Sequence, residues 1–413
     1  MKPLVDAQRE VLAAVPPLPE SRVSLARALG LVLAADVVAP HDVPPFDNSA
    51  MDGFAVRGSD VASAPVDLDV VEDVAAGHVP STAVAAGSAI RIMTGAPMPE
   101  GADTVVRVED TEIGRRPGTV RILVPTEAGT AVRRAGGDVA AGTVVMTQGT
   151  RLGPAHLGVL ATLGVTSPRV ARRWRVAILS TGDEVQPVTV PELRPGWIRD
   201  ANRPLLAGLL GELGAEVVDI GIVGDDPAML RTALRRAVTE SDAVVTSGGV
   251  SVGVHDLLKQ VLSQLGDVAL WQVAMQPAKP FAFGLVDGVP VFGLPGNPVS
   301  VLVAFEQFVR PALLAMSGAL RLFRPRVPGV AGETFATDPT KTVFLRVVTS
   351  LEGGRWVARS AGDQSSNVLS AAAAADALAV VPAGTGTVAE GEPLDLELLL
   401  APETRGAEEA LDG

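Results

Sequence analysis

Residues 175–184 read RVAILSTGDE and residues 243–253 read AVVTSGGVSVG, and these two stretches decide the fold. In each, a short apolar run typical of a buried strand gives way to small polar residues and glycine. The pattern predicts further strands at 216–223 and in the runs FAFGL and VPVFGL, and helices at 203–213, 227–239, 256–265 and 298–316. Strands alternating with helices of this length predict βαβ units on a mostly parallel, doubly wound sheet.

The segments on either side of this α/β core have different patterns. Residues 3–15 and 21–34 carry apolar residues at helical spacing, and the run GPAHLGVLATLG from Gly153 is similar. Short β segments separate them, which predicts a β domain inserted into one helical segment. Short β segments return after Gly318 and predict a small C-terminal all-β domain. The expected division is 1–45 plus 139–170, then 46–138, 171–318 and 319–413.

Composition excludes several classes of protein. The 413 residues are 47% hydrophobic, so the chain can bury large cores, and at about 150 residues per domain it forms two to four domains. A net charge of −13 without long basic runs argues against nucleic-acid binding. Cysteine is absent, which excludes disulfides, thiolate metal sites and cysteine nucleophiles. No signal core and no run of roughly 20 apolar residues is present, so we expect a cytoplasmic protein with no membrane partner.

Polar residues collect where two predicted strands end. In an open parallel sheet, ligands bind at the carboxyl ends of the strands. One loop is the segment 180–184, and the other contains Ser247, Gly248, Gly249 and Ser251. The second loop has the composition of an anion site, because glycine lets backbone N–H groups approach a phosphate and the following helix adds its dipole. Ordinary turns also use glycine, and an Asp such as Asp256 caps helices without any ligand.

The charged residues near these loops allow two interpretations each. Asp183 and Glu184 can cap a turn, or one of them can share Mg²⁺ with the phosphates of a ligand. Lys279 lies in a stiff Pro-containing segment and can neutralise a phosphate, although a lone lysine is more often solvated. The four histidines have no metal-site spacing.

Two polar segments of the inserted domain also stand out. Residues 47–55 read DNSAMDGFA where a strand should begin, and residues 93–99 read MTGAPMP. Asn, Asp and Ser are common in turns for local hydrogen-bonding reasons, so each segment alone has an ordinary explanation.

Taken together, these segments resemble the molybdopterin molybdenumtransferase family, which is the MoeA type and includes the E domain of gephyrin. The matching stretches are PPFDNSAMDGFAV, RIMTGAPMPEGADTVVRVED, VRRAGGDVAAGTVV, VAILSTGDEV, VTSGGVSVGVHD, KPFAFG and GLPGNPVSV, in the family's order. The resemblance implies a helical segment, an inserted β domain, a molybdopterin-binding α/β domain and a C-terminal β-barrel-like domain. It also implies a homodimer whose cleft lies between the α/β domain of one subunit and the inserted domain of the other.

The activity that the resemblance implies is insertion of molybdate into adenylylated molybdopterin with release of AMP, assisted by Mg²⁺. The positions that match catalytic residues of the family are Asp52, Thr94, Asp138, Glu184 and Asp256, of which Glu184 and Asp256 are the expected metal ligands. The expected pterin- and nucleotide-binding positions are Ser180, Thr181, Gly182, Asp183, Asp200, Asn202, Ser247, Gly248, Gly249, Ser251, Lys279, Pro295 and Pro298.

The chain departs from the family pattern at four positions. Gln276 stands where the family usually has Lys, Ala278 where it has Gly, Ala201 where Ser is common and Arg199 where Tyr is common. The loss of one cation beside the nucleotide weakens charge neutralisation, and the sequence leaves the choice between molybdate and tungstate open.

Two other functions compete with this interpretation. A molybdopterin adenylyltransferase shares the Thr-Ser-Gly-Gly loop but is normally the α/β domain alone. A non-catalytic pterin-binding scaffold would tolerate loss of the carboxylates. The sequence also leaves open whether a molybdopterin adenylyltransferase docks as a partner.

Overall fold

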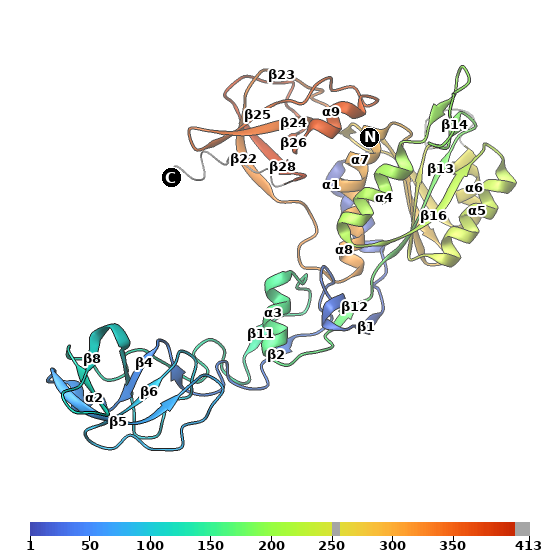
Figure 1. The fold of residues 1–413 in the computed structure, drawn as a ribbon. Helices are drawn as coiled ribbons and strands as arrows, with labels where there is room; N and C mark the ends of the chain where they lie inside the picture. Colours follow the sequence, from blue (N-terminus) through green and yellow to red (C-terminus); the bar gives the residue numbers. More distant parts are fainter. Residues whose placement is uncertain (250–256, 401–413) are drawn as a thin grey trace.

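The computed structural model describes residues 1–249 and 257–400, and it shows an elongated molecule (Figure 1). The inserted β domain lies at one end, and the α/β domain lies at the other. A slender linker region joins them, and the C-terminal β domain contacts the α/β domain through α9 and β24.

The α/β domain is built on a six-stranded sheet in the order β16, β13, β17, β21, β20, β18. The strands are β13 (Arg175–Thr181), β16 (Glu216–Val223), β17 (Ala243–Ser247), β18 (Asp267–Gln272), β20 (Pro280–Val286) and β21 (Val289–Leu294). The first four in sheet order are parallel, and β20 runs antiparallel to both of its neighbours. The prediction of a mostly parallel sheet is confirmed.

Helices cover both faces of this sheet, as the alternation of buried residues along β13 requires. Val176 and Ile178 pack into the core under α1 (Leu4–Ala14), α4 (Asn202–Leu213), α7 (Pro298–Ala304) and α8 (Arg310–Met316). Ala177 and Leu179 pack into the core under α5 (Pro227–Glu240) and α6 (Leu257–Leu265). Both faces of β13 are therefore buried, and the sheet is doubly wound as predicted.

The predicted long helix 298–316 is present but is not uniform. Its middle forms a π-helical turn, η3 (Phe305–Val309), between α7 and α8. The segment Pro298–Met316 is long and apolar enough to cross a membrane, but 89% of it is buried inside the protein, which is the property of a core helix.

The inserted domain contains a six-stranded sheet in the order β7, β4, β6, β5, β9, β8. The strands are β4 (Gly53–Val56), β5 (Val66–Val74), β6 (Ser88–Ile92), β7 (Thr104–Arg107), β8 (Thr111–Ile113) and β9 (Thr119–Ile122), with the short helix α2 (Gly58–Val61). Small apolar clusters pack on both faces of this sheet. The domain therefore has a core of its own.

The linker region corrects one prediction. Residues 21–34 are not a helix: their helical part is limited to the 3₁₀ turn η1 (Leu25–Arg27), and Gly30 has a positive φ of 78°. The backbone of Leu31 and Leu33 instead bonds to residues 150–152. The apolar residues of this segment are therefore buried in a backbone-paired structure and not on one face of a helix. Short ladders complete the region, namely β1 (Glu20–Arg22) with β12 (Arg169–Ala171), β2 (Val37–Val38) with β11 (Val144–Met146), and β3 (Asn48–Ser49) with β10 (Val132–Arg133), beside α3 (Pro154–Thr162).

The C-terminal domain is a closed β-barrel. Its strands are β22 (Arg326–Ala331), β24 (Thr342–Glu352), β25 (Arg355–Ser360), β26 (Ala377–Val381) and β28 (Pro393–Leu398), and pairing of β24 with β26 closes the ring. The short pair β23 (Phe335–Ala336) and β27 (Thr387–Val388) and the helix α9 (Leu369–Ala374) lie outside that ring. The strand β19 (Met275–Gln276) of the α/β domain pairs with β24, so the two domains share a strip of backbone hydrogen bonds.

Candidate functional site

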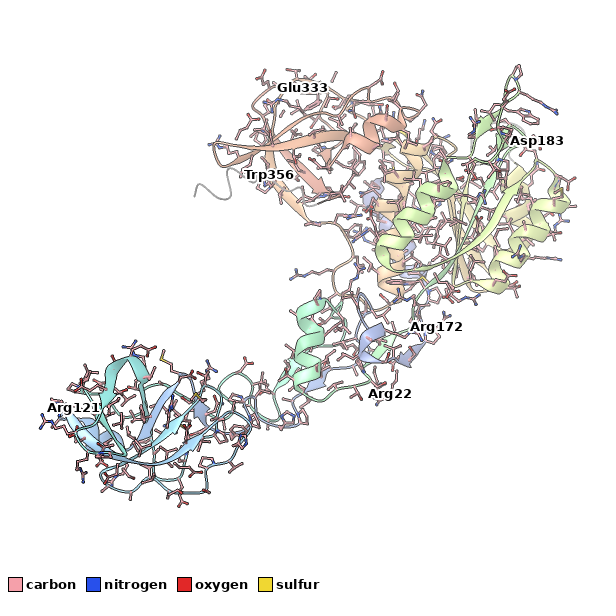
Figure 2. The ribbon with its side chains drawn as sticks, viewed as in Figure 1. Arg22, Arg121, Arg172, Asp183, Glu333 and Trp356 are labelled. Carbon is pink, nitrogen blue, oxygen red and sulfur yellow. The ribbon has the colours of Figure 1, made fainter. Side chains whose placement is uncertain are left out.

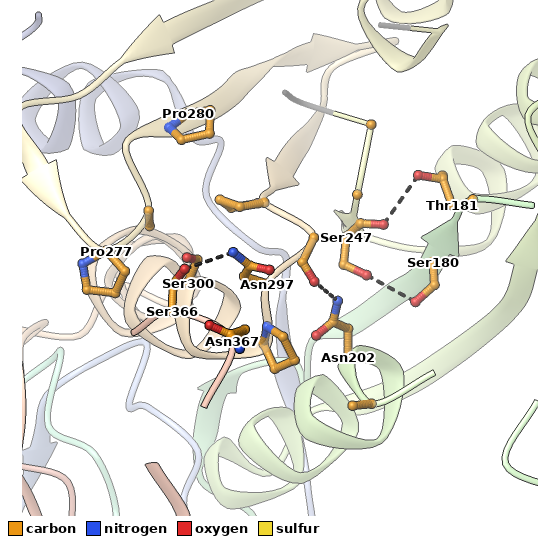
Figure 3. A pocket seen from close by; sticks show the side chains of 18 of the residues that line it. Ser180, Thr181, Asn202, Ser247, Pro277, Pro280, Asn297, Ser300, Ser366 and Asn367 are labelled. Carbon is orange, nitrogen blue, oxygen red and sulfur yellow. Dashed lines mark hydrogen bonds between the residues drawn. The ribbon is translucent and has the colours of Figure 1, made fainter. Parts of the chain in front are cut away.

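The two polar loops meet because β13 and β17 are neighbouring parallel strands. The Ser180 Oγ lies 3.0 Å from the Ser247 Oγ, and the Thr181 hydroxyl donates to the Ser247 carbonyl at 3.4 Å (Figure 3). Ser180 and Ser247 are almost fully buried. The predicted convergence at the carboxyl edge of the sheet is therefore present.

A cavity of about 950 Å³ opens at this edge. Most of the residues that the sequence nominated for binding line it, together with one of the nominated carboxylates. These are Ser180, Thr181, Gly182, Glu184, Asp200, Asn202, Ser247, Gly248, Gly249, Lys279, Pro295 and Pro298.

Asp200 and Asn202 have different roles in the wall of this pocket. Asp200 is 3% exposed, and its carboxylate accepts from the Ser180 hydroxyl at 3.0 Å and from the Arg203 Nε at 2.6 Å. Its charge is thus already compensated. Asn202 donates from Nδ2 to the Gly296 carbonyl at 2.8 Å, but its buried Oδ1 has no described hydrogen-bond partner. Because buried polar atoms are nearly always paired, that oxygen can accept a donor from a bound ligand.

Gly248 and Gly249 shape the wall of the pocket more than they donate hydrogen bonds into it. Gly248 and Gly249 both have positive φ, and a Cβ on Gly248 would lie 2.8 Å from the Thr181 carbonyl oxygen. The Gly248 N–H already donates to the Leu294 carbonyl at 3.1 Å, so this N–H is not free for an anion. Close approach of the Thr181 backbone is the reason for glycine at this position.

Glu184 and Lys279 are two of the exposed charged residues that line the pocket, together with Arg199 and Asp225. A Cβ on Gly182 would lie 2.5 Å from Glu184 Oε2, so the Glu184 carboxylate lies directly over that glycine. Lys279 is exposed at the opposite loop and forms no salt bridge with any described residue. The pocket therefore presents to a ligand both a carboxylate and an ammonium that has no salt-bridge partner among the described residues.

The loop that carries Lys279 contains backbone strain. Ala278 has a φ of 72° and is 3% exposed, in the left-handed region that favours glycine. The usual family glycine at this position is explained by that conformation.

We expect Ala278→Val to lower the free energy of unfolding by about 2 kcal/mol or more, because a β-branched residue is strained at this φ and the site has no room. Ala278→Gly should stay within about 1 kcal/mol of the parent. Urea unfolding of the three proteins measures both changes. Equal stability of the Val and Gly variants would contradict this explanation.

The C-terminal barrel contributes a wall that sequence reasoning missed. Lys341, Gln364, Ser365, Ser366 and Asn367 line the pocket, and Asn297 Nδ2 donates to the Ser366 Oγ at 2.8 Å. The polar run DQSSN after the strand RWVARS was the available signal, but only the packing of the two domains shows its use. Asp225 and Ser300 also line the pocket without having been nominated.

The remaining nominated residues do not line this pocket. Asp183 lies at the rim of the α/β domain (Figure 2), where its carboxylate accepts from the Asp225 N–H at 2.9 Å. Asp52, Thr94 and Asp138 belong to the inserted domain and the linker, far from the pocket of the same chain. Ser251 and Asp256 lie outside the described residues.

Asp52 and Thr94 do come together within the inserted domain. One carboxylate oxygen of Asp52 accepts from both the N–H and the hydroxyl of Thr94, each at 2.7 Å. These bonds, the hydroxyl first, hold the pKa of Asp52 below its usual value. Asp52 is therefore fixed as an exposed carboxylate.

Removing the Thr94 hydroxyl should shift the pH dependence of the reaction. In Thr94→Val the pKa of Asp52 rises towards its usual value, so the carboxylate protonates at a higher pH and the acidic limb of kcat/KM moves to higher pH. Thr111→Val is the matched control, because among the described residues the Thr111 hydroxyl donates to the Val108 carbonyl and to no carboxylate. An acidic limb that stays in place would show that Asp52 does not titrate in turnover.

A polar pocket at the carboxyl edge of a doubly wound sheet, walled by a second domain, is typical of α/β proteins that bind small anionic molecules. Successive segments match the MoeA N-terminal region (domains I and II; residues 2–164), the probable molybdopterin binding domain (177–315) and the MoeA C-terminal region (domain IV; 328–399). The chain belongs to the molybdopterin molybdenumtransferase (MoeA) family.

Similar proteins of known name support the same membership over nearly the whole chain. The molybdopterin molybdenumtransferase 2 of Mycobacterium tuberculosis is 40% identical over 91% of this chain and 94% of its own length. The molybdopterin molybdenumtransferase of Haemophilus influenzae is 37% identical over 96% of this chain and 98% of its own. The molybdopterin biosynthesis moeA protein of Pyrococcus horikoshii has a similar structure, with a TM-score of 0.83, 28% identity and coverage of 96% of this chain and 100% of that one.

Proposed function

We propose that this chain is a cytoplasmic molybdopterin molybdenumtransferase that inserts molybdate into adenylylated molybdopterin and releases AMP. The observation that carries the proposal is the pocket itself, which brings together Glu184, Lys279, the barrel loop 364–367 and the Oδ1 of Asn202, an atom without a hydrogen-bond partner among the described residues. These groups supply donors, an acceptor and opposite charges to a ligand that contains a pterin, phosphates and a nucleoside.

Each residue of the pocket has a binding role that follows from its chemistry. Lys279 neutralises phosphate charge, and the serines of the barrel loop donate hydroxyl hydrogen bonds to oxygen atoms of the ligand. Asn202 Oδ1 accepts from a ligand N–H, which the pterin ring offers. The wall of barrel residues excludes water from one side of the pocket.

The described residues are compatible with Mg²⁺ as an assisting cation. No cluster of three or more potential metal ligands is found among residues 1–249 and 257–400. Mg²⁺ usually keeps several waters and binds one or two carboxylates together with substrate phosphates, so it needs no such cluster. Glu184 would hold it against the substrate, with Asp256 as the second proposed ligand, and the cation would offset the charge of the pyrophosphate.

We also propose that the enzyme is a homodimer with a shared active site. Of the nominated catalytic residues, Asp52, Thr94 and Asp138 do not line the chain's own pocket, and the elongated shape separates them from it (Figure 1). The inserted domain of a second subunit would bring them to Glu184.

Turnover of adenylylated molybdopterin with molybdate and Mg²⁺ tests the function. We expect AMP release that depends on molybdate, together with reconstitution of a molybdoenzyme apoprotein. ATP-dependent adenylylation of molybdopterin would instead identify an adenylyltransferase, and tight pterin binding without AMP release would identify a scaffold. Repeating the assay with tungstate measures the metal preference.

A further inference from the structure

The C-terminal barrel can complete the pocket only if it keeps a fixed position on the α/β domain. Its loop 364–367 reaches the pocket, and the bond between Asn297 and Ser366 there is exposed to solvent. The other strip at this edge, β19 with β24, is only two residues long. An exposed hydrogen bond and a short ladder do not by themselves hold a domain in one orientation.

A buried polar contact joins the two domains elsewhere. Along β28, the side chains of Leu394 and Leu396 point into the barrel core. The side chain of Glu397 points out of the barrel, yet Glu397 is only 1% exposed. One oxygen of Glu397 accepts from Gln307 Nε2 of the π-helical turn at 2.7 Å. The other accepts from Arg326 of the neighbouring barrel strand at 3.1 Å.

The residue before Gln307 in the π-helical turn, Glu306, forms a second buried contact. Glu306 is 1% exposed, and its two carboxylate oxygens each accept from Arg324 at 2.9 Å. Arg324 belongs to the segment between the two domains, and it also donates to the Leu399 carbonyl at 2.7 Å and to Glu212 at 3.2 Å. We call Glu306, Gln307, Arg324, Arg326 and Glu397 the interdomain cluster.

The chemistry of the interdomain cluster makes one domain arrangement strongly preferred. Phe344, Leu378 and Val380 of the barrel also belong to the buried core of the α/β domain, but apolar attraction is non-directional, whereas a buried carboxylate loses its compensation if its partner moves away. Burial raises the pKa of Glu397. The charge and hydrogen bonds of Arg326 and the hydrogen bond from Gln307 oppose that rise. A reorientation of the barrel would therefore separate Gln307 from Glu397 and remove one of the hydrogen bonds that compensate the Glu397 carboxylate.

We propose that Gln307 and Glu397 are positioning residues for the reaction, because their contact holds the barrel so that the loop 364–367 forms a wall of the pocket. The inference rests on the proposed function for its kinetic consequence, but the orientation of the barrel is measurable without turnover.

The distance between the two domains is the first test. The chain has no cysteine, so spin labels can be placed at Met229→Cys on α5 and Leu351→Cys on the barrel, both of which are exposed. With labelled chains diluted into an excess of unlabelled chains, so that distances between subunits of the proposed dimer do not contribute, we expect one narrow distance distribution in the parent and a broad one in Glu397→Leu and in Gln307→Leu. Gln307→Leu leaves the Glu397–Arg326 pair inside the barrel intact, so it tests the contact even if Glu397→Leu does not fold.

Matched variants separate positioning from general destabilisation. Glu352→Gln breaks an exposed glutamate–arginine pair of the same barrel, and it should leave the distance distribution unchanged. Glu397→Gln can still accept from Gln307, so it should keep a narrow distribution. An unchanged distribution in both leucine variants would overturn the proposal.

Kinetics provide the second test. If the barrel occupies its working position about a tenth of the time in Gln307→Leu, KM for adenylylated molybdopterin rises about tenfold, while kcat changes by less than about twofold. Glu397→Gln should keep KM close to the parent value. A broad distance distribution with an unchanged KM would show that the contact is merely structural. If the parent itself releases no AMP, the proposed function fails, and the distances still decide whether the contact orients the barrel.

Discussion

An equimolar mixture of Asp52→Asn and Glu184→Gln chains should recover about a quarter of the parent turnover, although each variant alone loses at least about a hundredfold in kcat. The two carboxylates lie in different domains, and only Glu184 lines the pocket of its own chain. If the active site is shared across a dimer, a mixed dimer contains one site with both carboxylates intact and one site with both replaced. Random pairing makes about half of the dimers mixed, which leaves about a quarter of all sites active.

The loss in each single variant follows from the role of the missing charge. Asp52 is fixed as a carboxylate by two bonds from Thr94, and Asn at this position is neutral. Glu184 lies over Gly182 at the mouth of the pocket, where an amide cannot hold a cation in the way a carboxylate does. Removing one group that acts on a developing charge commonly lowers kcat by about a hundredfold to a thousandfold.

A matched pair of variants controls for simple chain mixing. Asp52→Asn and Asp138→Asn both lie outside the α/β domain, so every mixed dimer contains one of the two changes at each site. Their mixture should stay inactive. Recovery in this control, or its absence in the Asp52 and Glu184 mixture after exchange of chains has been verified with two affinity tags, would contradict a site shared between subunits.

The α/β domain was predictable because its signals are local. The runs at β13 and β17 are apolar on both faces, and the chain changes from them to serine and glycine where the strands end. The parallel arrangement of neighbouring strands then places Ser180 beside Ser247. The part of the pocket that these two strand ends form follows from these two facts.

What could not be predicted depends on contacts between distant segments. Residues 21–34 have helical spacing, but pairing of Leu31 and Leu33 with residues 150–152 satisfies their backbone. The barrel loop 364–367 reaches the pocket only through domain packing, which no local pattern encodes. Glu306 and Gln307 are polar residues within an otherwise apolar helix. Their contacts in the interdomain cluster explain why polar residues occur there.

Lys279→Met should raise KM for adenylylated molybdopterin by about 10- to 100-fold with a much smaller effect on kcat, since a hydrogen bond to a charged group contributes about 1.5–3 kcal/mol. Lys279 lines the pocket and forms no salt bridge with a described residue, so its charge is available to phosphate. The other lysine of the pocket, Lys341, is paired with Asp338 at 2.5 Å. Lys2→Met removes the same charge at a site beside Glu10 and Trp271, and it should leave KM unchanged.

The departure at Gln276 gives this prediction its sharpest form. Gln276 lines the same pocket as Lys279 and is exposed, so Gln276→Lys places a second ammonium beside the ligand without burying it. We expect this change alone to lower KM by about fivefold, which corresponds to about 1 kcal/mol, and to restore part of the affinity lost in Lys279→Met. Both effects should weaken as ionic strength rises, because the charges are solvent-exposed. A KM that is insensitive to Gln276→Lys at low salt would mean that position 276 does not face the phosphates, and that the family lysine there serves another purpose in the loop.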